Sequence, residues 1–340
     1  MKERTQGRKL LVTGGAGFIG SNFIRYWLSQ HPRDTIVNLD KLTYAGNLDN
    51  LRDVDKDSRY RFVRGDIADR KIVEEMYLEP PDLVVNFAAE THVDRSIGNP
   101  DDFIRTDIWG TYVLLEGART HGVGRFIQIS TDEVYGSVAE GCSREDDALM
   151  PRNPYAASKA GADRLAYSYH ATYGLPVIIT RASNNFGPYQ YPEKLIPLFV
   201  TNALDDQSLP LYGDGLNVRD WLFVVDHCRA IDLLAEKGTP GEVYNIGGDN
   251  PLSNRELTFR ILDYLGKPRS LIRHVRDREG HDRRYALNSG KIEGLGWRPS
   301  ADFDLKLQET IAWYRDNRWW WEKIKSGEFK AYYLRQYGKR

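Results

Sequence analysis

A tyrosine and a lysine lie four residues apart near the middle of the chain, at Tyr155 and Lys159. Asn153 and Pro154 precede them and are typical of a helix start, so the phenol and the ammonium are expected on one face of a helix. A neighbouring Lys⁺ favours the phenolate and is expected to lower the pKa of Tyr155. The pair therefore predicts a base that removes the proton of a hydroxyl group.

Two adjacent carboxylates, Asp132 and Glu133, follow the apolar segment Phe126–Ser130, with Thr131 between. That segment is expected to be a buried strand, and carboxylates at a strand end are candidates for a general acid and a general base. Neighbouring Asp and Glu residues are usually just solvated. The catalytic interpretation therefore depends on a cofactor site beside them.

A glycine-rich turn near the N-terminus predicts such a site. Leu10–Thr13 reads as a strand, and glycines then recur at every third position, at Gly14, Gly17 and Gly20. Such a turn lets the backbone approach a pyrophosphate, and the following helix offers N–H donors and a positive dipole end. A second expected strand, Thr35–Leu39, ends at Asp40, whose carboxylate could accept both hydrogen bonds of an adenosine ribose. This favours NAD over NADP, although the adjacent Lys41 weakens the preference.

Short apolar runs alternate with amphipathic segments through the first half of the chain. The expected strands are Leu10–Thr13, Thr35–Leu39, Tyr60–Val63, Leu83–Phe87, Phe126–Ser130 and Val177–Thr180, and Glu242–Ile246 could return to the same sheet. The alternation predicts a doubly wound α/β fold, with a parallel Rossmann sheet covered on both faces. Asp66 and Ala88 follow two of these strands, where a dinucleotide crevice is expected.

The pattern loosens after Phe186, where prolines and glycine-containing turns become frequent. We therefore expect a second, smaller α/β domain that binds the substrate. The NAD-binding domain is expected to comprise residues 1–186 and about 222–250, and the second domain about 187–221 and 251–340. The aromatic C-terminal stretch, Trp313–Tyr337, is expected to pack terminal helices against the second domain.

Composition excludes several classes of protein. The net charge of -1 hides no basic or acidic half, so nucleic acid and membrane surfaces are not expected partners. No apolar run is long enough to span a bilayer, and no signal peptide is recognisable. Cys142 and Cys228 have neither metal-ligand nor disulfide spacing, so both thiols are expected to be free, no metal is expected, and the cytoplasm is the expected compartment.

Several longer strings carry a resemblance to a known family. They are Lys41–Asn47, Ala88–Ser96, Thr131–Gly136, Pro188–Pro197 and Gly280–Tyr285. Together with the glycine turn, Tyr155 and Lys159, they resemble the extended short-chain dehydrogenase/reductase superfamily and, within it, the dTDP-glucose 4,6-dehydratases. The similarity covers nearly the whole chain, although the segment between Glu133 and Tyr155 is shorter than in some members.

The resemblance implies a reaction and a role for each catalytic residue. Tyr155 takes the proton of the sugar 4-hydroxyl as C4 gives its hydride to NAD⁺, and Thr131 bonds the sugar near O4. Glu133 then removes the C5 proton, and a protonated Asp132 donates to the departing C6 hydroxyl. The hydride returns to C6, so NAD is a bound cofactor that is not consumed.

The resemblance also implies binding residues. The expected cofactor contacts are Gly14, Gly17, Phe18, Ile19, Gly20, Asp40, Lys41, Asp66, Ile67, Ala88, Ala89, Thr106, Tyr155, Lys159 and Asn185. The expected substrate contacts are Thr91, Thr131, Asn184, Lys194, Leu195, Arg219, Asn254 and His281, with Arg283 as a further candidate. The planar fork of Arg219 suits a diphosphate. A homodimer is expected through the helix that bears Tyr155 and the helix before it.

Three alternatives share much of this pattern. A nucleotide-sugar 4-epimerase would use the same glycine turn, Asp40, Tyr155 and Lys159, but it needs neither Asp132 nor Glu133. A UDP-glucuronate decarboxylase leaves Asp132 unexplained, and a non-catalytic sensor has little use for the complete set. UDP-glucose and CDP-glucose remain alternative substrates, because a few side chains of the second domain read the base.

Overall fold

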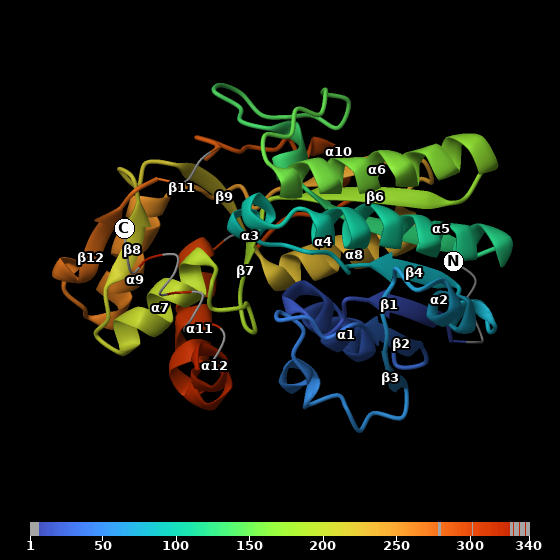
Figure 1. The fold of residues 1–340 in the computed structure, drawn as a ribbon, viewed down its shortest axis with the longest axis horizontal. Coiled ribbons are helices and arrows are strands. Elements are labelled where there is room, and N and C mark those ends of the chain that lie inside the picture. The colour runs from blue at the N-terminus through green and yellow to red at the C-terminus, as the bar shows by residue number, and fades with distance from the viewer. Residues whose placement is uncertain are drawn as a thin grey trace.

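The computed structural model describes residues 7–277, 280–300 and 302–326, together with Phe329, Tyr333 and Tyr337. Its largest element is a seven-stranded sheet with the order β10-β6-β5-β4-β1-β2-β3, in which every neighbouring pair is parallel (Figure 1). The strands are β1 (Lys9–Thr13), β2 (Thr35–Asp40), β3 (Tyr60–Arg64), β4 (Leu83–Asn86), β5 (Arg125–Thr131), β6 (Val177–Ala182) and β10 (Val243–Ile246). The predicted doubly wound fold is confirmed, including the late return of β10.

Helices cover both faces of this sheet. Along β1, Leu10 and Val12 belong to one apolar core, and Leu11 between them belongs to another, as the two-residue period of a strand requires. The first core is closed by α1 (Phe18–Gln30) and α8 (Val224–Lys237). The second is closed by α2 (Arg70–Tyr77), α5 (Thr111–Thr120) and α6 (Pro154–Tyr173).

Short helical turns join these elements on the carboxyl side of the strands. They are η1 (Leu48–Leu51), α3 (Val93–Gly98), α4 (Asp101–Phe103), the π-helical η2 (Ile104–Gly110), η3 (Asp132–Tyr135) and α10 (Gly290–Glu293). π turns are frequently found at functional sites. Two of these turns carry buried carboxyl groups, Asp107 in η2 and Asp132 in η3.

A second region with its own core lies beside the carboxyl ends of the large sheet (Figure 1). It contains a small sheet of β7 (Asn184–Phe186), β9 (Val218–Phe223) and β11 (Pro251–Ser253), and a parallel pair of β8 (Leu209–Tyr212) and β12 (Ile272–Val275). Its helices are α7 (Leu195–Leu204), α9 (Asn254–Leu265), α11 (Phe303–Asp316) and α12 (Arg318–Lys325), with the short η4 (Arg269–Leu271). The division into two domains at the predicted boundaries stays a prediction, and β7, which ends at the boundary of Phe186, pairs with β9 of this region.

The aromatic C-terminal stretch packs as predicted where it is described. Tyr314, Trp320 and Trp321 are buried in the core of the second region. The Trp320 indole also donates to Asn50 Oδ1 at 2.8 Å, which ties α12 to the loop after β2. Cys142 and Cys228 are both free, as expected. Among the described helices none is long and apolar enough to cross a membrane.

Candidate active site

The glycine turn between β1 and α1 leaves no room for side chains. Gly14 has a φ of +69°, and a Cβ there would lie 2.6 Å from the backbone nitrogen of Ala88. The helix α1 starts at Phe18 without a side-chain cap and without an acidic residue in its first turn. Its first N–H groups and its positive dipole end are therefore suited to a phosphate.

Asp40 ends β2 next to this turn. Its Oδ2 accepts from the Ala16 N–H at 2.8 Å and its Oδ1 from the Leu42 N–H at 2.8 Å, so each oxygen keeps a lone pair for a further donor. Burial raises the pKa of Asp40, and the two backbone hydrogen bonds oppose this rise. The neighbouring Lys41 forms an ion pair with Asp66 at 2.8 Å. From the sequence, Lys41 was the residue whose charge could have favoured the 2′-phosphate of NADP, and this ion pair occupies it.

A first cavity opens over the carboxyl ends of the large sheet. Of the fifteen predicted cofactor residues, all but one line it: Gly14, Gly17, Phe18, Ile19, Gly20, Asp40, Lys41, Asp66, Ile67, Ala88, Ala89, Thr106, Tyr155 and Lys159. Thr91 and Lys194, predicted as substrate contacts, line it as well. The structure does not bring Asn185 to this cavity. Its amide oxygen lies 3.0 Å from Nδ1 of the buried His227 instead.

A second cavity adjoins the first and shares Gln190, Glu193 and Lys194 with it. The predicted substrate residues that line it are Asn184, Lys194, Leu195, Arg219, Asn254 and His281, and Asn185 lines it too. The side-chain oxygens of Asn184 and Asn254 are buried without a hydrogen-bond partner among the described residues. Buried amides are normally satisfied, so these two point to a polar ligand. Arg283 lies apart from this cavity, in an exposed ion pair with Asp214.

The carboxylate pair lies at the end of β5. Thr131 Oγ1 caps the turn η3 by accepting from the Glu133 N–H at 3.3 Å, and it bonds to Asp132 Oδ1 at 3.2 Å. Asp132 is 3% exposed, and its Oδ2 has no partner in the described chain. Burial, and next the charge of Glu133, raise the pKa of Asp132 well above its usual range, while Arg219 opposes them. The raised pKa favours the neutral form of Asp132, which is the form that an acid needs, whereas Glu133 lines the second cavity.

Tyr155 and Lys159 lie on α6, which begins as predicted, with Asn153 Oδ1 accepting from the Ala156 N–H at 2.8 Å. The predicted lowering of the Tyr155 pKa is wrong. Desolvation by burial, followed by the charges of Glu133 and Asp107, raises it well above its usual range, and a hydrogen bond with Thr131 opposes this only in part. The Lys159 ammonium, which was expected to lower it, donates to the Ile129 carbonyl at 2.7 Å.

The comparisons with known proteins agree with this geometry. The family model described as GDP-mannose 4,6 dehydratase matches residues 11–310. The chain belongs to this family. A dTDP-glucose 4,6-dehydratase of Streptomyces antibioticus is 55% identical over 322 residues, which cover 93% of this chain and 95% of the relative.

Two solved structures show that the fold of this dehydratase family is shared by enzymes that catalyse different reactions. DesIV, a dTDP-glucose 4,6-dehydratase from Streptomyces venezuelae with NAD and TYD bound, has a TM-score of 0.91 at 55% identity and covers 93% of this chain and 100% of its own. A UDP-glucose 4-epimerase from Thermotoga maritima has a TM-score of 0.85 at 29% identity, and the match covers 91% of this chain and 99% of the epimerase chain. Because dehydratases and epimerases share the fold, only the site can separate the two reactions.

Sequence reasoning gave no role to two carboxyl groups beside the first cavity of this family member. Asp107, on the π turn η2, accepts from the Ser158 hydroxyl at 2.5 Å and from the Glu90 N–H at 2.9 Å. Burial raises the pKa of Asp107 to about 6, and Lys159 opposes this rise. Burial, and next Asp107, raise the pKa of Glu90 to about 7. Asp107 follows the predicted contact Thr106 directly, but nothing in its spacing indicates that it faces Lys159.

Glu193 was also missed, and it lies where the two cavities join. Its carboxylate accepts from the Tyr44 hydroxyl at 2.9 Å and pairs with Arg95 at 3.4 Å. The Arg95 guanidinium lies 3.6 Å over the Tyr44 ring. These three side chains come from segments that are far apart in the sequence, so only the folded chain brings them together.

Proposed function

We propose that this protein is an NAD-dependent dTDP-glucose 4,6-dehydratase, a hydro-lyase that converts dTDP-glucose to dTDP-4-keto-6-deoxyglucose and water. One observation carries the proposal. Asp132, whose pKa is raised by burial, and the neighbouring Glu133 both lie close enough to Tyr155 to act electrostatically on its phenol. This combination provides an acid, a second carboxylate and a tyrosine at one place.

The first cavity fits NAD. A tight glycine turn, the uncapped start of α1 and the Asp40 carboxylate follow one another in the order that a pyrophosphate and an adenosine ribose require. Tyr155 and Lys159 at the other side of the cavity would contact the nicotinamide end. Bound NAD would supply a hydride acceptor at C4 of the sugar and a hydride donor at C6. The Streptomyces venezuelae relative, which has NAD bound, supports this assignment.

The residues of the chain would divide the proton transfers among them. Tyr155 takes the proton of the 4-hydroxyl, with Thr131 bonded to both the phenol and Asp132. The resulting 4-keto group makes the C5 proton acidic, and Glu133 removes it. Asp132, whose protonated form burial favours, donates to O6, and water leaves.

A 4-epimerase reaction would leave this arrangement unused. Moving a hydride off and onto C4 needs no acid at O6 and no base at C5. Burying Asp132 with one oxygen unpaired costs stability, which a mere structural role would not justify. The carboxylate pair therefore favours the dehydratase over the epimerase and the decarboxylase.

The second cavity is proposed to hold the nucleotide diphosphate. Arg219 and Lys194 provide positive charge, and Asn184 and Asn254 provide polar atoms. The choice of dTDP over UDP or CDP is supported by the names of the 55% identical relatives. Arg219 lies 4.4 Å over the Tyr285 ring, and this ring holds its guanidinium in place.

The test is incubation of the purified protein with dTDP-glucose in D₂O without added NAD⁺, with UDP-glucose in parallel. The expected product is dTDP-4-keto-6-deoxyglucose with deuterium at C5, identified by mass spectrometry and proton NMR. Faster conversion of UDP-glucose would change only the assigned base. If neither sugar loses water, even after addition of NAD⁺, the dehydratase assignment is wrong.

We also propose a homodimer and a cytoplasmic location. The dimer would form through α5 and α6, and α6 exposes Tyr167 and Tyr173. Analytical ultracentrifugation of the wild type and a Tyr167→Glu variant tests this, because a charge at the interface should favour the monomer. The two free thiols suit a reducing compartment.

A further inference from the structure

The turn that carries the carboxylate pair has little apolar contact with the helix that carries Tyr155. In η3 and α6, only Val134, Tyr135 and Ala160 form a small buried cluster, with Leu149 and Leu287 at its edge. Apolar packing of this extent fixes position but not orientation. The direction in which Asp132 and Glu133 point must therefore be set by polar contacts.

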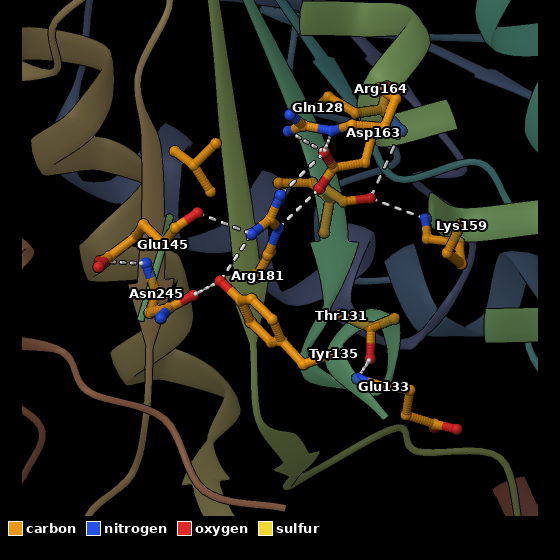
Figure 2. Close-up of polar contacts among 12 residues, drawn as sticks. Gln128, Thr131, Glu133, Tyr135, Glu145, Lys159, Asp163, Arg164, Arg181 and Asn245 are labelled. Atoms are coloured by element: carbon orange, nitrogen blue, oxygen red, sulfur yellow. Dashed lines mark hydrogen bonds and ion pairs between the residues drawn. The ribbon is translucent and has the colours of Figure 1, made fainter. Parts of the chain in front are cut away.

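Arg181 of β6 provides these contacts at the back of the site. Its side chain is 1% exposed and forms a two-pronged ion pair with Asp163 of α6, with Nε donating to Oδ2 at 2.8 Å and Nη2 to Oδ1 at 3.1 Å. The remaining nitrogen, Nη1, donates to the hydroxyl of Tyr135 at 2.6 Å (Figure 2). One guanidinium thus bonds simultaneously to the helix and to the last residue of the turn.

The other side of the turn is held as well. The Tyr135 hydroxyl donates to Asn245 Oδ1 on β10 at 2.8 Å, and Arg181 Nη1 also donates to the Glu145 carbonyl at 3.1 Å. The Asn245 N–H in turn donates to Glu145 Oε1 at 3.0 Å. Figure 2 shows that these bonds surround Tyr135 on the side away from Glu133.

The protonation state of Tyr135 suits a structural hydrogen bond and not a catalytic base. Burial raises the pKa of Tyr135 to about 12, although Arg181 opposes this rise. Tyr135 therefore stays a neutral phenol at neutral pH and can donate and accept at once. On α6, Asp163 lies four residues after Lys159 and eight after Tyr155, so it shares their face of the helix.

We propose that Arg181 and Tyr135 are positioning residues, which hold the turn bearing Asp132 and Glu133 in a fixed orientation relative to Tyr155 and Lys159. Loss of water can then follow oxidation without rearrangement of the site. The inference rests on the proposed dehydratase function. The two residues have different roles: Tyr135 orients only the turn, whereas Arg181 orients both the turn and α6.

Tyr135→Phe tests this directly, because it removes one hydroxyl and leaves the Arg181–Asp163 pair intact. The holoenzyme is mixed with dTDP-glucose in a single turnover, and NADH absorbance is followed together with the dehydrated product. We expect NADH to form at a rate within about threefold of wild type and to decay about 10- to 100-fold more slowly, because a small misplacement of the carboxylates affects only the second step. NADH should then accumulate.

Tyr169→Phe is the matched control, since Tyr169 is a buried tyrosine of α6 whose hydroxyl bonds to Glu116, and neither residue lines the two cavities. It should leave both phases unchanged. If Tyr135→Phe slows both phases equally, or neither, the positioning role is wrong while the function stands. If wild type itself forms no dehydrated sugar, the function and the inference both fail.

Arg181→Lys is a second variant in case Tyr135→Phe does not fold. Lysine keeps the charge beside Asp163 but lacks the fork that reaches Asp163 and Tyr135 together. Both phases should slow, and loss of water should slow about tenfold more than oxidation. Equal slowing would contradict the proposal, because a general loss of structure does not distinguish the two steps.

Discussion

The two cavities share three residues at their junction, yet they are built in different ways. The first is lined largely by glycines, alanines and strand ends from the first half of the chain, and its key carboxylate, Asp40, has its hydrogen bonds in place. The second is assembled from side chains spread from His92 to Tyr337, and it contains buried amide oxygens that have no hydrogen-bond partner within the described part of the chain. The backbone shapes the first cavity, whereas long-range contacts between side chains shape the second.

The largest effects are expected from Tyr155, which lines the first cavity, and from Asp132, the buried neighbour of Glu133 in the second. Tyr155→Phe should slow NADH formation by about 10²- to 10⁴-fold, because it removes the base assigned to the 4-hydroxyl. Asp132→Asn should form NADH near the wild-type rate and slow loss of water by a similar factor, because the amide cannot protonate O6. Stopped-flow absorbance and quenched product analysis measure the two steps. Equal and complete loss of NADH formation in both variants would contradict the assigned roles.

Gly20→Ala tests whether the backbone shapes the first cavity. A Cβ at Gly20 would lie 2.4 Å from the Gly14 carbonyl oxygen and 2.8 Å from the Gly15 Cα, so the turn would have to move. We expect the purified variant to retain about 10- to 100-fold less NAD, since strain of this kind costs on the order of 1–3 kcal/mol.

Gly98→Ala is the control for that variant. A Cβ at Gly98 would meet no atom within 4 Å, and its φ is not in the left-handed region. NAD content after gel filtration should equal that of wild type. Retention of NAD by Gly20→Ala would show that the turn tolerates a side chain, and the fit of the first cavity would need another explanation.

The same difference decides what the sequence could predict. Nearly all the residues predicted to contact the cofactor line the first cavity, because strand periodicity, glycine spacing and Asp40 are local signals that survive without a fold. Thr106 and Asn185 were assigned from the resemblance alone, and of these two only Thr106 lines the cavity. Glu193, with partners at Tyr44 and Arg95, joins segments far apart in the sequence, and no local pattern announces it.

The pKa of Tyr155 was predicted in the wrong direction for a related physical reason. The spacing of Tyr155 and Lys159 was right, but spacing says nothing about burial or about which acceptor the ammonium finds. Desolvation of the phenol and the nearby carboxyl groups outweigh the lysine, which bonds to the Ile129 carbonyl. Electrostatic balance at a buried site depends on every element packed against it.

Arg219→Lys tests the second cavity. Lysine keeps the charge but loses the fork that could hold two diphosphate oxygens, so KM for dTDP-glucose should rise about tenfold or more, since a hydrogen bond to a charged group contributes about 1.5–3 kcal/mol. Bound NAD should be unchanged. Arg283→Lys, in its exposed pair with Asp214, is the matched control and should leave KM alone. If KM rose for Arg283→Lys and not for Arg219→Lys, the diphosphate would have to be assigned to the surface around Arg283 and not to the second cavity.

The rates of oxidation and of loss of water should depend differently on pH, with smaller effects than those of the substitutions. Tyr155 acts as a base only when ionised, and its raised pKa means that the ionised fraction grows as pH rises. Oxidation should therefore accelerate by at most about tenfold per pH unit through the neutral range. Asp132 acts only when protonated, and its raised pKa extends the protonated form to higher pH than for an ordinary carboxyl group. Loss of water should stay constant below that raised pKa and fall only when pH passes it.

Single-turnover rates measured across pH, with NADH formation and decay fitted separately, check both signs. Asp132→Asn should abolish the fall at high pH in the second phase while leaving the rise in the first, because the amide does not titrate. If NADH formation were independent of pH, proton removal by Tyr155 would not limit the first step. A second phase that accelerated with pH would mean that Asp132 acts as a carboxylate, and the acid would have to be sought among the other buried carboxyl groups, of which Asp107 and Glu90 lie nearest to Lys159 and the first cavity.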